Sequence, residues 1–220
     1  RLLRAITDAG RERPIFTLLP SQHDALRRRL LDPAQVAIVL QMPTSAGKTL
    51  LAEFAIAQVY GAYGKGARIA YVCPTRALAT QIRGTLTQDQ GPIDIRVSAA
   101  GGAFEEDPYE IQLLTDTDGV AVATPEKLDL MLRAHPDWAA ELRLVVVDEA
   151  HLLSDGERGV RLELLLANLR REQPQARLLL LTPFVTNANR IAEWLGEERG
   201  TPIEVHWRPS RLLLGAASFQ

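Results

Sequence analysis

Short runs of apolar residues alternate with longer amphipathic stretches along most of the chain. Several runs, such as Leu142–Val147, are almost continuously apolar, as expected for strands buried on both faces of a sheet. The predicted strands are Val36–Gln41, Arg68–Cys73, Asp94–Ser98, Gly119–Ala123, Leu142–Val147, Arg177–Leu181 and Ile203–Trp207. The predicted helices are Ser21–Leu31, Lys48–Tyr60, Thr75–Leu86, Pro125–Arg133, Val160–Glu172 and Asn187–Leu195. This alternation predicts a single α/β domain with a mostly parallel, twisted sheet flanked by helices.

Several short sequences mark the expected boundaries of these elements. Ser21 is predicted to cap the first helix, and Pro125 is predicted to open a later one. The pairs Gly91-Pro92, Asp107-Pro108 and His135-Pro136 predict turns inside one domain, because glycine and proline favour turn geometries.

A glycine-containing loop lies directly between the first predicted strand and the helix that begins at Lys48. It reads Met42-Pro43-Thr44-Ser45-Ala46-Gly47-Lys48-Thr49, the pattern of a phosphate-binding loop in which methionine replaces the first glycine. Backbone N–H groups would face the phosphates, Lys48 would bind their oxygens and the Thr49 hydroxyl would hold Mg²⁺. The alternative is an ordinary strand-to-helix turn with a chance Gly-Lys-Thr.

Two adjacent carboxylates follow the predicted strand Leu142–Val147. Asp148 and Glu149 begin the sequence Asp-Glu-Ala-His, at the strand end where open α/β sheets bind ligands. Asp148 there could hold Mg²⁺, and Glu149 could orient and deprotonate an attacking water. An acidic helix cap is the alternative for this segment alone. Together with the phosphate-binding loop, the pair favours nucleotide hydrolysis.

The two motifs together resemble the first RecA-like lobe of superfamily 2 helicases, a DEAH-containing P-loop NTPase domain. The resemblance covers nearly the whole chain and lies nearest to the Ski-like branch, on the sequences Gly47–Glu53 and Ala192–Gly196. It implies ATP and Mg²⁺ as cofactors. The implied ATP-binding residues are Gln22, which senses adenine in that family, Thr44, Ser45, Ala46, Gly47, Lys48 and Thr49. It also implies catalytic roles for Lys48, Asp148 and Glu149, with Thr49 and Asp148 as metal ligands.

Further motifs of the family match residues between and after these two. The implied nucleic-acid contacts are Thr75, Arg76, Gly101, Gly102, Thr124 and Lys127, and the implied coupling residues are His151 and Thr182. Each contact residue follows a predicted strand or begins a helix, where it could bind a sugar-phosphate backbone or simply form a turn or cap. The family's Ser-Ala-Thr motif is replaced here by Thr182-Pro183-Phe184. Thr182 could still reach Asp148 or His151, and packing by Phe184 could replace the lost hydroxyl.

The expected function is therefore an ATP-binding helicase or translocase domain, with DNA slightly favoured. An RNA helicase and a non-unwinding nucleic-acid-dependent ATPase remain alternatives, and a small-molecule P-loop kinase is disfavoured by the helicase motifs. The expected organisation is a helicase domain over residues 1–208 and the start of a linker over residues 209–220. The linker would lead to a second RecA-like lobe in a longer polypeptide. Alone, the fragment is expected to be poorly active.

Composition changes this interpretation little. A net charge of −2 gives no overall basic field, but a backbone-binding groove needs only a few donors. The single cysteine, Cys73, excludes an intrachain disulfide and suits a reducing compartment. The sequence lacks a signal peptide and any apolar run of the ~18 residues that a membrane span requires. A cytoplasmic protein is expected, associated with the nucleoid if it is bacterial.

Overall fold

A seven-stranded, all-parallel sheet forms the centre of the protein in the computed structural model, which describes residues 17–90, 95–99 and 119–208. The strands are β1 (Ala37–Gln41), β2 (Arg68–Val72), β3 (Arg96–Ala99), β4 (Gly119–Ala123), β5 (Leu142–Val147), β6 (Arg177–Thr182) and β7 (Gly200–Glu204). Their order in the sheet is β3-β4-β2-β5-β6-β1-β7. The predicted α/β fold with a parallel sheet is thereby confirmed.

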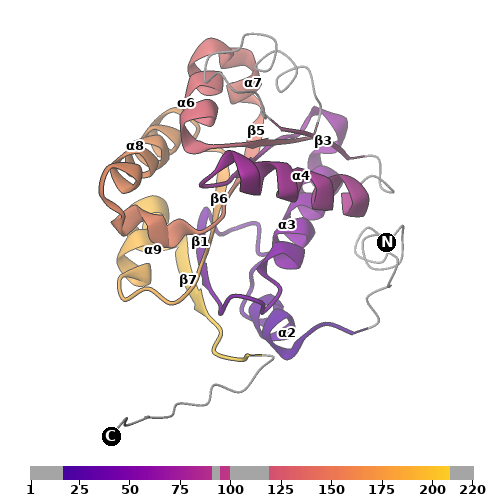
Figure 1. Ribbon diagram of the computed structural model, residues 1–220, viewed down its shortest axis with the longest axis vertical. Helices are drawn as coiled ribbons and strands as arrows, with labels where there is room; N and C mark the ends of the chain where they lie inside the picture. The colour runs from indigo at the N-terminus through magenta and orange to yellow at the C-terminus, as the bar shows by residue number, and fades with distance from the viewer. Residues whose placement is uncertain (1–16, 91–94, 100–118, 209–220) are drawn as a thin grey trace, which may run out of the picture.

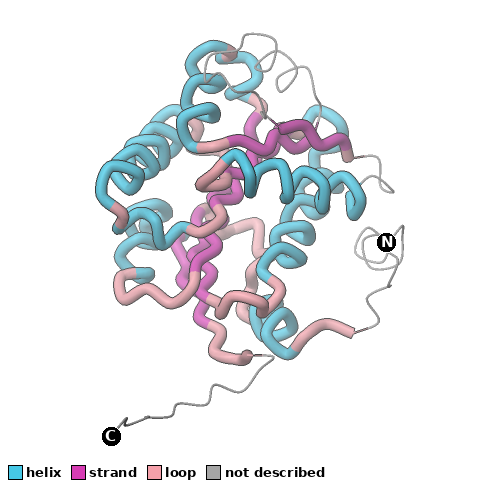
Figure 2. Tube along the Cα trace, viewed as in Figure 1, coloured by secondary structure: helices cyan, strands magenta, loops and turns pink. Residues whose placement is uncertain are grey.

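Helices cover both faces of this sheet (Figures 1 and 2). They are α2 (Pro20–Arg27), α3 (Lys48–Tyr63), α4 (Arg76–Gln90), α6 (Pro125–Ala134), α7 (Pro136–Ala140), α8 (Gly156–Glu172) and α9 (Ala188–Gly196). Three 3₁₀ turns, η1 (Gly64–Gly66), η3 (Ala150–Ser154) and η4 (Glu197–Arg199), join them to the strands. Among the described residues, no helix is long and apolar enough to span a membrane.

The two faces of the sheet form two separate hydrophobic clusters. Successive residues of β5 alternate between them: Leu144 and Val146 pack towards α3 and α4, while Val145 and Val147 pack towards α6, α8 and α9. A parallel strand covered on both sides needs apolar residues on both faces, which is why β5 is continuously apolar from Leu144 to Val147. Because the strands are parallel, their carboxyl ends lie at the same edge of the sheet, where the loops after β1, β2, β4, β5 and β6 converge.

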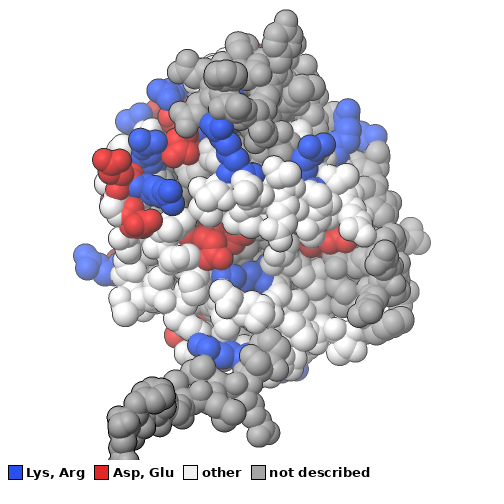
Figure 3. Space-filling view, in the orientation of Figure 1, with Lys and Arg blue, Asp and Glu red and all other residues white. Residues whose placement is uncertain are grey.

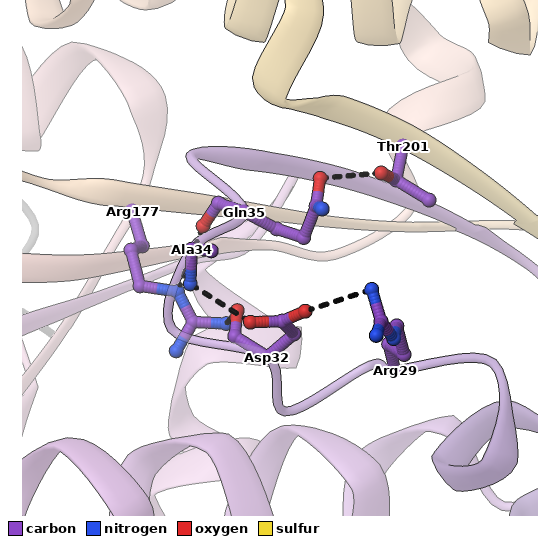
Figure 4. Close-up of polar contacts among 6 residues, drawn as sticks. All are labelled: Arg29, Asp32, Ala34, Gln35, Arg177 and Thr201. Atoms are coloured by element: carbon purple, nitrogen blue, oxygen red, sulfur yellow. Dashed lines mark hydrogen bonds and ion pairs between the residues drawn. The ribbon is translucent and has the colours of Figure 1, made fainter.

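The opposite edge of the sheet is tied to the segment before β1 by one arginine (Figure 4). The guanidinium of Arg177 on β6 donates to the carbonyls of Gln35 and Asp32, each at 3.2 Å, and to Gln58 Oε1 at 3.1 Å. Burial lowers the pKa of Arg177, and the neighbouring Asp32 carboxylate opposes that shift. These donors are used within the fold, so Arg177 fixes the segment before β1 and takes no part in the site at the other edge.

Three sequence predictions about the elements are wrong. Ser21 does not cap α2; Leu19 occupies the cap position, and the Ser21 hydroxyl donates to another loop. Pro136 does not simply form a turn but opens the short helix α7. The last strand is Gly200–Glu204 and not Ile203–Trp207. It is an edge strand paired only with β1, and an edge strand can include a proline such as Pro202, which lacks an N–H to donate.

The predicted turns Gly91-Pro92 and Asp107-Pro108 lie outside the described residues, as does Asp94 at the start of the third predicted strand. The other predicted elements are present with small shifts at their ends. For example, the helix predicted to begin at Thr75 is α4, which begins one residue later, at Arg76. β4 and β5 have the bounds predicted for them.

Candidate nucleotide-binding site

The loop after β1 has the backbone geometry of an anion-binding loop. Ser45 and Gly47 both adopt positive φ, at 65° and 84°, and Gly47 immediately precedes α3. The positive φ favours glycine here, and a Cβ on Gly47 would lie 2.1 Å from Nε2 at the end of the Gln22 side chain, which would have to move. Met42, at the position of the family's first glycine, buries its side chain completely in the core.

Helix α2 is anchored on this loop by two side chains. The Ser21 hydroxyl donates to the Ala46 carbonyl at 3.0 Å, and Gln22 Nε2 donates to the Gly47 carbonyl at 3.2 Å. Gln22 Oε1 accepts from the Leu19 N–H at 2.9 Å. Both ends of this buried amide are thus engaged with the protein, and one N–H hydrogen remains. The structure brings Gln22 to the phosphate-binding loop, while its contact with a base stays a prediction.

Lys48 carries a buried cation that the fold leaves without a hydrogen-bond partner. Among the described residues, none accepts a hydrogen bond from its Nζ, which is inaccessible to solvent. The ammonium is close enough to Asp148 to oppose the rise in the pKa of that carboxyl. Leaving a buried donor unsatisfied costs about 1–3 kcal/mol, more for a charged group. Such an arrangement is typical of a side chain whose partner is a bound anion.

Asp148 lies at the carboxyl end of β5, held by two hydrogen bonds. Its Oδ2 accepts from the Tyr71 hydroxyl at 3.2 Å, and its Oδ1 accepts from the Glu149 N–H at 3.0 Å. Burial raises the pKa of the Asp148 carboxyl, and the Glu149 carboxylate raises it further. The Glu149 N–H, the Lys48 ammonium and the Tyr71 hydroxyl all oppose that rise. A second cation at this carboxylate would stabilise its charged form further.

Glu149 adopts a left-handed backbone conformation, with φ of 53° and ψ of 44°. This conformation is uncommon for a residue with a long side chain and costs on the order of 1–3 kcal/mol. It turns the chain sharply from β5 into η3. Glu149 Oε2 lies 3.1 Å from His151 Nδ1, and both side chains are partly exposed. Strain of this kind is concentrated at functional sites, which supports a role for the Glu149 side chain.

The predicted hydrogen bond of Thr182 is not present in the structure. Thr182 is buried at the end of β6, and its hydroxyl has no hydrogen-bond partner in the described part of the chain. Its carbonyl instead accepts from the Met42 N–H at 3.0 Å, linking β6 to the start of the phosphate-binding loop. Among the described residues, the Thr182 hydroxyl thus makes no hydrogen bond to Asp148 or His151, and its coupling role stays a prediction.

Phe184 packs on His206, with ring centroids 4.9 Å apart and an angle of 14° between the rings. The backbone next to this pair is held by Gln41, whose Oε1 accepts from the Val185 N–H at 2.8 Å. The Gln41 carbonyl also accepts from the Val205 N–H at 2.9 Å. The loop after β6 and the segment after β7 are thus joined at the residue that precedes the phosphate-binding loop. The packing predicted for Phe184 has a partner in His206.

The predicted nucleic-acid contacts fall into three groups. Thr75, Arg76 and Thr124 line one cavity of about 230 Å³ at the carboxyl edge. Lys127 is buried in the first turn of α6, where its N–H donates to the Thr124 hydroxyl at 3.4 Å. Gly101 and Gly102 lie outside the described residues. The structure therefore brings three of the six predicted residues to one accessible place.

Two site residues were missed by the sequence interpretation, Tyr71 and Gln41. Tyr71 lies in the apolar run Ile69–Val72 of β2, and Gln41 ends β1 directly after the apolar run Ala37–Leu40. That pattern is the signal that could have identified them. Buried polar side chains need partners, and those partners are here the acidic motif and the loop after β6.

Comparison with known proteins agrees with this geometry. Residues 19–190 match the DEAD/DEAH box helicase family. The chain is 33% identical over 219 residues to the ATP-dependent DNA helicase Hel308 of Methanocella arvoryzae, covering 97% of this chain and 28% of the relative. It is 33% identical over 205 residues to Hel308 of Thermococcus kodakarensis, covering 93% and 17%. The chain spans less than a third of the length of either relative.

Solved structures with the same fold include the DUF1998 helicase MrfA. The superposition has a TM-score of 0.69 at 20% sequence identity and covers 93% of this chain and 32% of MrfA. For MrfA bound to DNA, the TM-score is 0.70 at 20% identity, covering 94% and 29%. At this level of identity, the likeness shows that the two share a fold.

Proposed function

Because the chain belongs to the DEAD/DEAH box helicase family, we propose that it is the ATP-binding lobe of an ATP-dependent DNA helicase or translocase. The observation that carries the proposal is the buried Lys48 ammonium beside Asp148, which no described residue hydrogen-bonds, at the sheet edge where the phosphate-binding loop and the acidic motif meet. Both Hel308 relatives are named ATP-dependent DNA helicases. Those names favour DNA over RNA as the nucleic acid.

The residues present suit ATP with Mg²⁺. The phosphate oxygens of ATP would accept hydrogen bonds from the Lys48 ammonium. The backbone N–H groups of the loop Thr44–Gly47 would face the same phosphates. No group of three or more acidic, histidine or cysteine side chains that could hold a metal occurs in the described residues. Mg²⁺ rarely needs one, because it retains water and binds substrate phosphates. Thr49 and Asp148 would provide the protein ligands.

Hydrolysis would depend on what the chain's own groups do around that complex. The bound metal would neutralise charge that develops on the phosphates during transfer. Asp148, fixed by Tyr71 and by the Glu149 N–H, would hold the metal in one position. Glu149 would orient a water and accept its proton; His151 Nδ1 lies 3.1 Å from the Glu149 carboxylate.

The domain organisation in this proposal is a helicase domain over residues 1–208 with the start of a linker after it. The relatives are more than three times as long as the matched region, which supports a further RecA-like lobe that completes the ATP site. The finer assignment to the Ski-like branch is not supported, since both relatives are named Hel308. An RNA helicase and a nucleic-acid-dependent ATPase that does not unwind are the alternative functions.

The experiment that tests the proposal is ATP turnover with single-stranded DNA, duplex DNA and RNA added in parallel. The chain alone should bind ATP but hydrolyse it slowly, because an arginine finger worth on the order of 10³–10⁵ in rate would belong to the second lobe. A longer form containing that lobe should be stimulated most by DNA. Stimulation by RNA alone would favour the RNA alternative, and rapid turnover by the chain alone would contradict the division between lobes.

Replacing Tyr71 with phenylalanine should weaken Mg²⁺-dependent nucleotide binding about three- to tenfold, the net worth of one ordinary hydrogen bond. The change removes only the hydroxyl that orients Asp148 Oδ2, so binding without Mg²⁺ should stay unchanged. Titration with a fluorescent ADP analogue, with Mg²⁺ and with EDTA, measures both values. Tyr60→Phe on α3 is the matched control. An equal loss in both conditions would show that Tyr71 acts only on folding.

A further inference from the structure

The carboxyl end of β1 is bonded to the segments that follow both of its neighbouring strands. Gln41 ends β1, and it lies opposite Thr182 of β6 on one side and Glu204 of β7 on the other. Its side-chain Oε1 accepts from the Val185 N–H at 2.8 Å, and its carbonyl accepts from the Val205 N–H at 2.9 Å. One buried residue thus joins the loop after β6 to the segment after β7.

The rings of Phe184 and His206 connect the same two segments directly. Neighbouring strands lie about 4.8 Å apart, so β6 and β7, which flank β1, are separated by roughly 10 Å. The two side chains close that distance, because their ring centroids are 4.9 Å apart and the rings are nearly parallel. His206 Nε2 also lies 3.3 Å from Glu204 Oε1, but that contact stays within its own segment. The stacked rings therefore bridge the two segments that flank the end of β1.

These contacts are hydrogen bonds and ring packing. Charged side chains of both signs gather over α6 and α8 in Figure 3, whereas β1 and β7 end in another part of the same view (Figure 1). Hydrogen bonds weaken steeply as their distance and angle change, and ring packing depends on direct contact. A displacement of either segment would therefore be felt by the other.

The same contacts hold the start of the phosphate-binding loop. Met42 directly follows Gln41, and its N–H donates to the Thr182 carbonyl at 3.0 Å while its side chain is completely buried. The backbone N–H groups expected to face the phosphates belong to residues 44–47, only a few positions further on. A rearrangement of the loop around bound phosphates would therefore act on Gln41.

From this arrangement we propose that Gln41, Phe184 and His206 are positioning residues that transmit a nucleotide-dependent shift of the phosphate-binding loop to residues 205–208. The inference rests on the proposed function, because it requires that the loop bind ATP. The three side chains act through the loop and not on the nucleotide itself. ATP can shift this segment only as far as it binds the two arrangements with different affinity. In the proposed domain organisation the segment leads into the linker towards a further lobe.

Trp207 provides a reporter within that segment. It directly follows His206 and is 36% exposed, so its emission depends on how the segment lies against the protein. The chain has three tryptophans, and Trp138→Phe combined with Trp194→Phe leaves Trp207 as the only one. Saturating ATP with Mg²⁺ is expected to change the emission of this single-tryptophan chain. Calorimetric titration with ATP measures binding independently.

The test removes one ring at a time in that background. Phe184→Leu retains an apolar side chain without the ring, and His206→Ala removes the other ring at an exposed position, where folding is least affected. Each change should abolish the ATP-dependent change in emission. The affinity for ATP should fall by no more than about tenfold, the upper worth of an aromatic pair. His206→Phe should restore the signal, because a phenyl ring can stack on Phe184 as the imidazole does.

Two further variants test the hydrogen bond and the specificity of the loss. Gln41→Met retains the length of the side chain and removes the oxygen that accepts from Val185, so it should abolish the signal and weaken ATP binding about two- to tenfold. Tyr63→Leu is the matched control, since Tyr63 is an exposed aromatic residue at the opposite edge of the sheet, packed under the Arg143 guanidinium. It should change neither the signal nor the affinity.

Four results separate the inference from the proposed function. An undiminished signal in Phe184→Leu and His206→Ala, with ATP bound, would overturn the inference and leave the proposed function intact, whether or not their melting temperatures fall. ATP binding by the single-tryptophan chain without any change in emission would do the same. Loss of the signal in Tyr63→Leu would also overturn it, because the effect would not be specific to the bridge. Failure of the single-tryptophan chain to bind ATP would remove the inference and the proposed function together.

Discussion

Replacing Lys48 with methionine is expected to lower the affinity of the chain for ATP by roughly 10- to 100-fold, the worth of a hydrogen-bonded charge. The same change should raise the melting temperature of the nucleotide-free chain by at least about 2 °C. Both effects have one cause. The Lys48 ammonium is buried and has no hydrogen-bond partner in the part of the chain that the structure describes, so it destabilises the empty site and stabilises the occupied one. Methionine retains the apolar stem and removes only the charge.

Calorimetric titration with ATP and thermal melting with and without nucleotide measure the two effects. Lys65→Met is the control, since this exposed lysine lies in η1 at the opposite edge of the sheet. It should change neither value. Loss of affinity combined with a lower melting temperature would mean that Lys48 supports the fold and that its role at the phosphates is unproven. Unchanged affinity would reject the phosphate-binding loop itself.

The strands could be predicted from sequence where burial on both faces made them uniformly apolar. β4 and β5 lie in the interior of the sheet, and their bounds agree with the prediction. β7 lies at the edge, where only one neighbour constrains it, and its apolar residues gave the wrong bounds. The close approach of Gly200 to α9 sets its position, because a Cβ there would lie 1.9 Å from the Ala192 carbonyl. Such a contact between distant segments leaves no periodic signal.

The residues of the candidate site likewise fall into those that local sequence predicts and those that depend on distant partners. The residues that were predicted together are contiguous in sequence, since the geometry of a phosphate-binding loop and of a strand end is local. Tyr71 and Gln41 could not be placed in advance, because their partners Asp148 and Val185 lie 77 and 144 residues away. Thr182 shows the converse case. Its position in the motif favoured a hydrogen bond, but its side chain is buried at the end of β6 and its hydroxyl has no partner among the described residues.

Replacing Glu149 with glutamine is expected to reduce ATP hydrolysis about 10²- to 10⁴-fold, the usual contribution of a general base. Glutamine has the same shape and tolerates the same backbone, so the strained turn at φ 53° should be retained. It cannot accept a proton from water, whereas Asp148 remains available to hold the metal. Binding of ATP with Mg²⁺ should therefore stay within about twofold of the unchanged protein. Single-turnover hydrolysis in the form that contains the second lobe measures the rate, and titration of the chain measures binding.

Glu157→Gln provides the matched control, because Glu157 is an exposed carboxylate in the first turn of α8, close to the same motif in sequence. It should hydrolyse ATP at the normal rate, which separates a specific loss from a general change of charge. The contact of Glu149 with His151 gives a second criterion. If that contact were the main role of Glu149, His151→Ala would slow hydrolysis as much as Glu149→Gln does. A general base predicts a far smaller loss in His151→Ala, because the carboxylate would still be present to take the proton. Equal losses of binding and hydrolysis in Glu149→Gln would show that the residue shapes the site and does not act on the water.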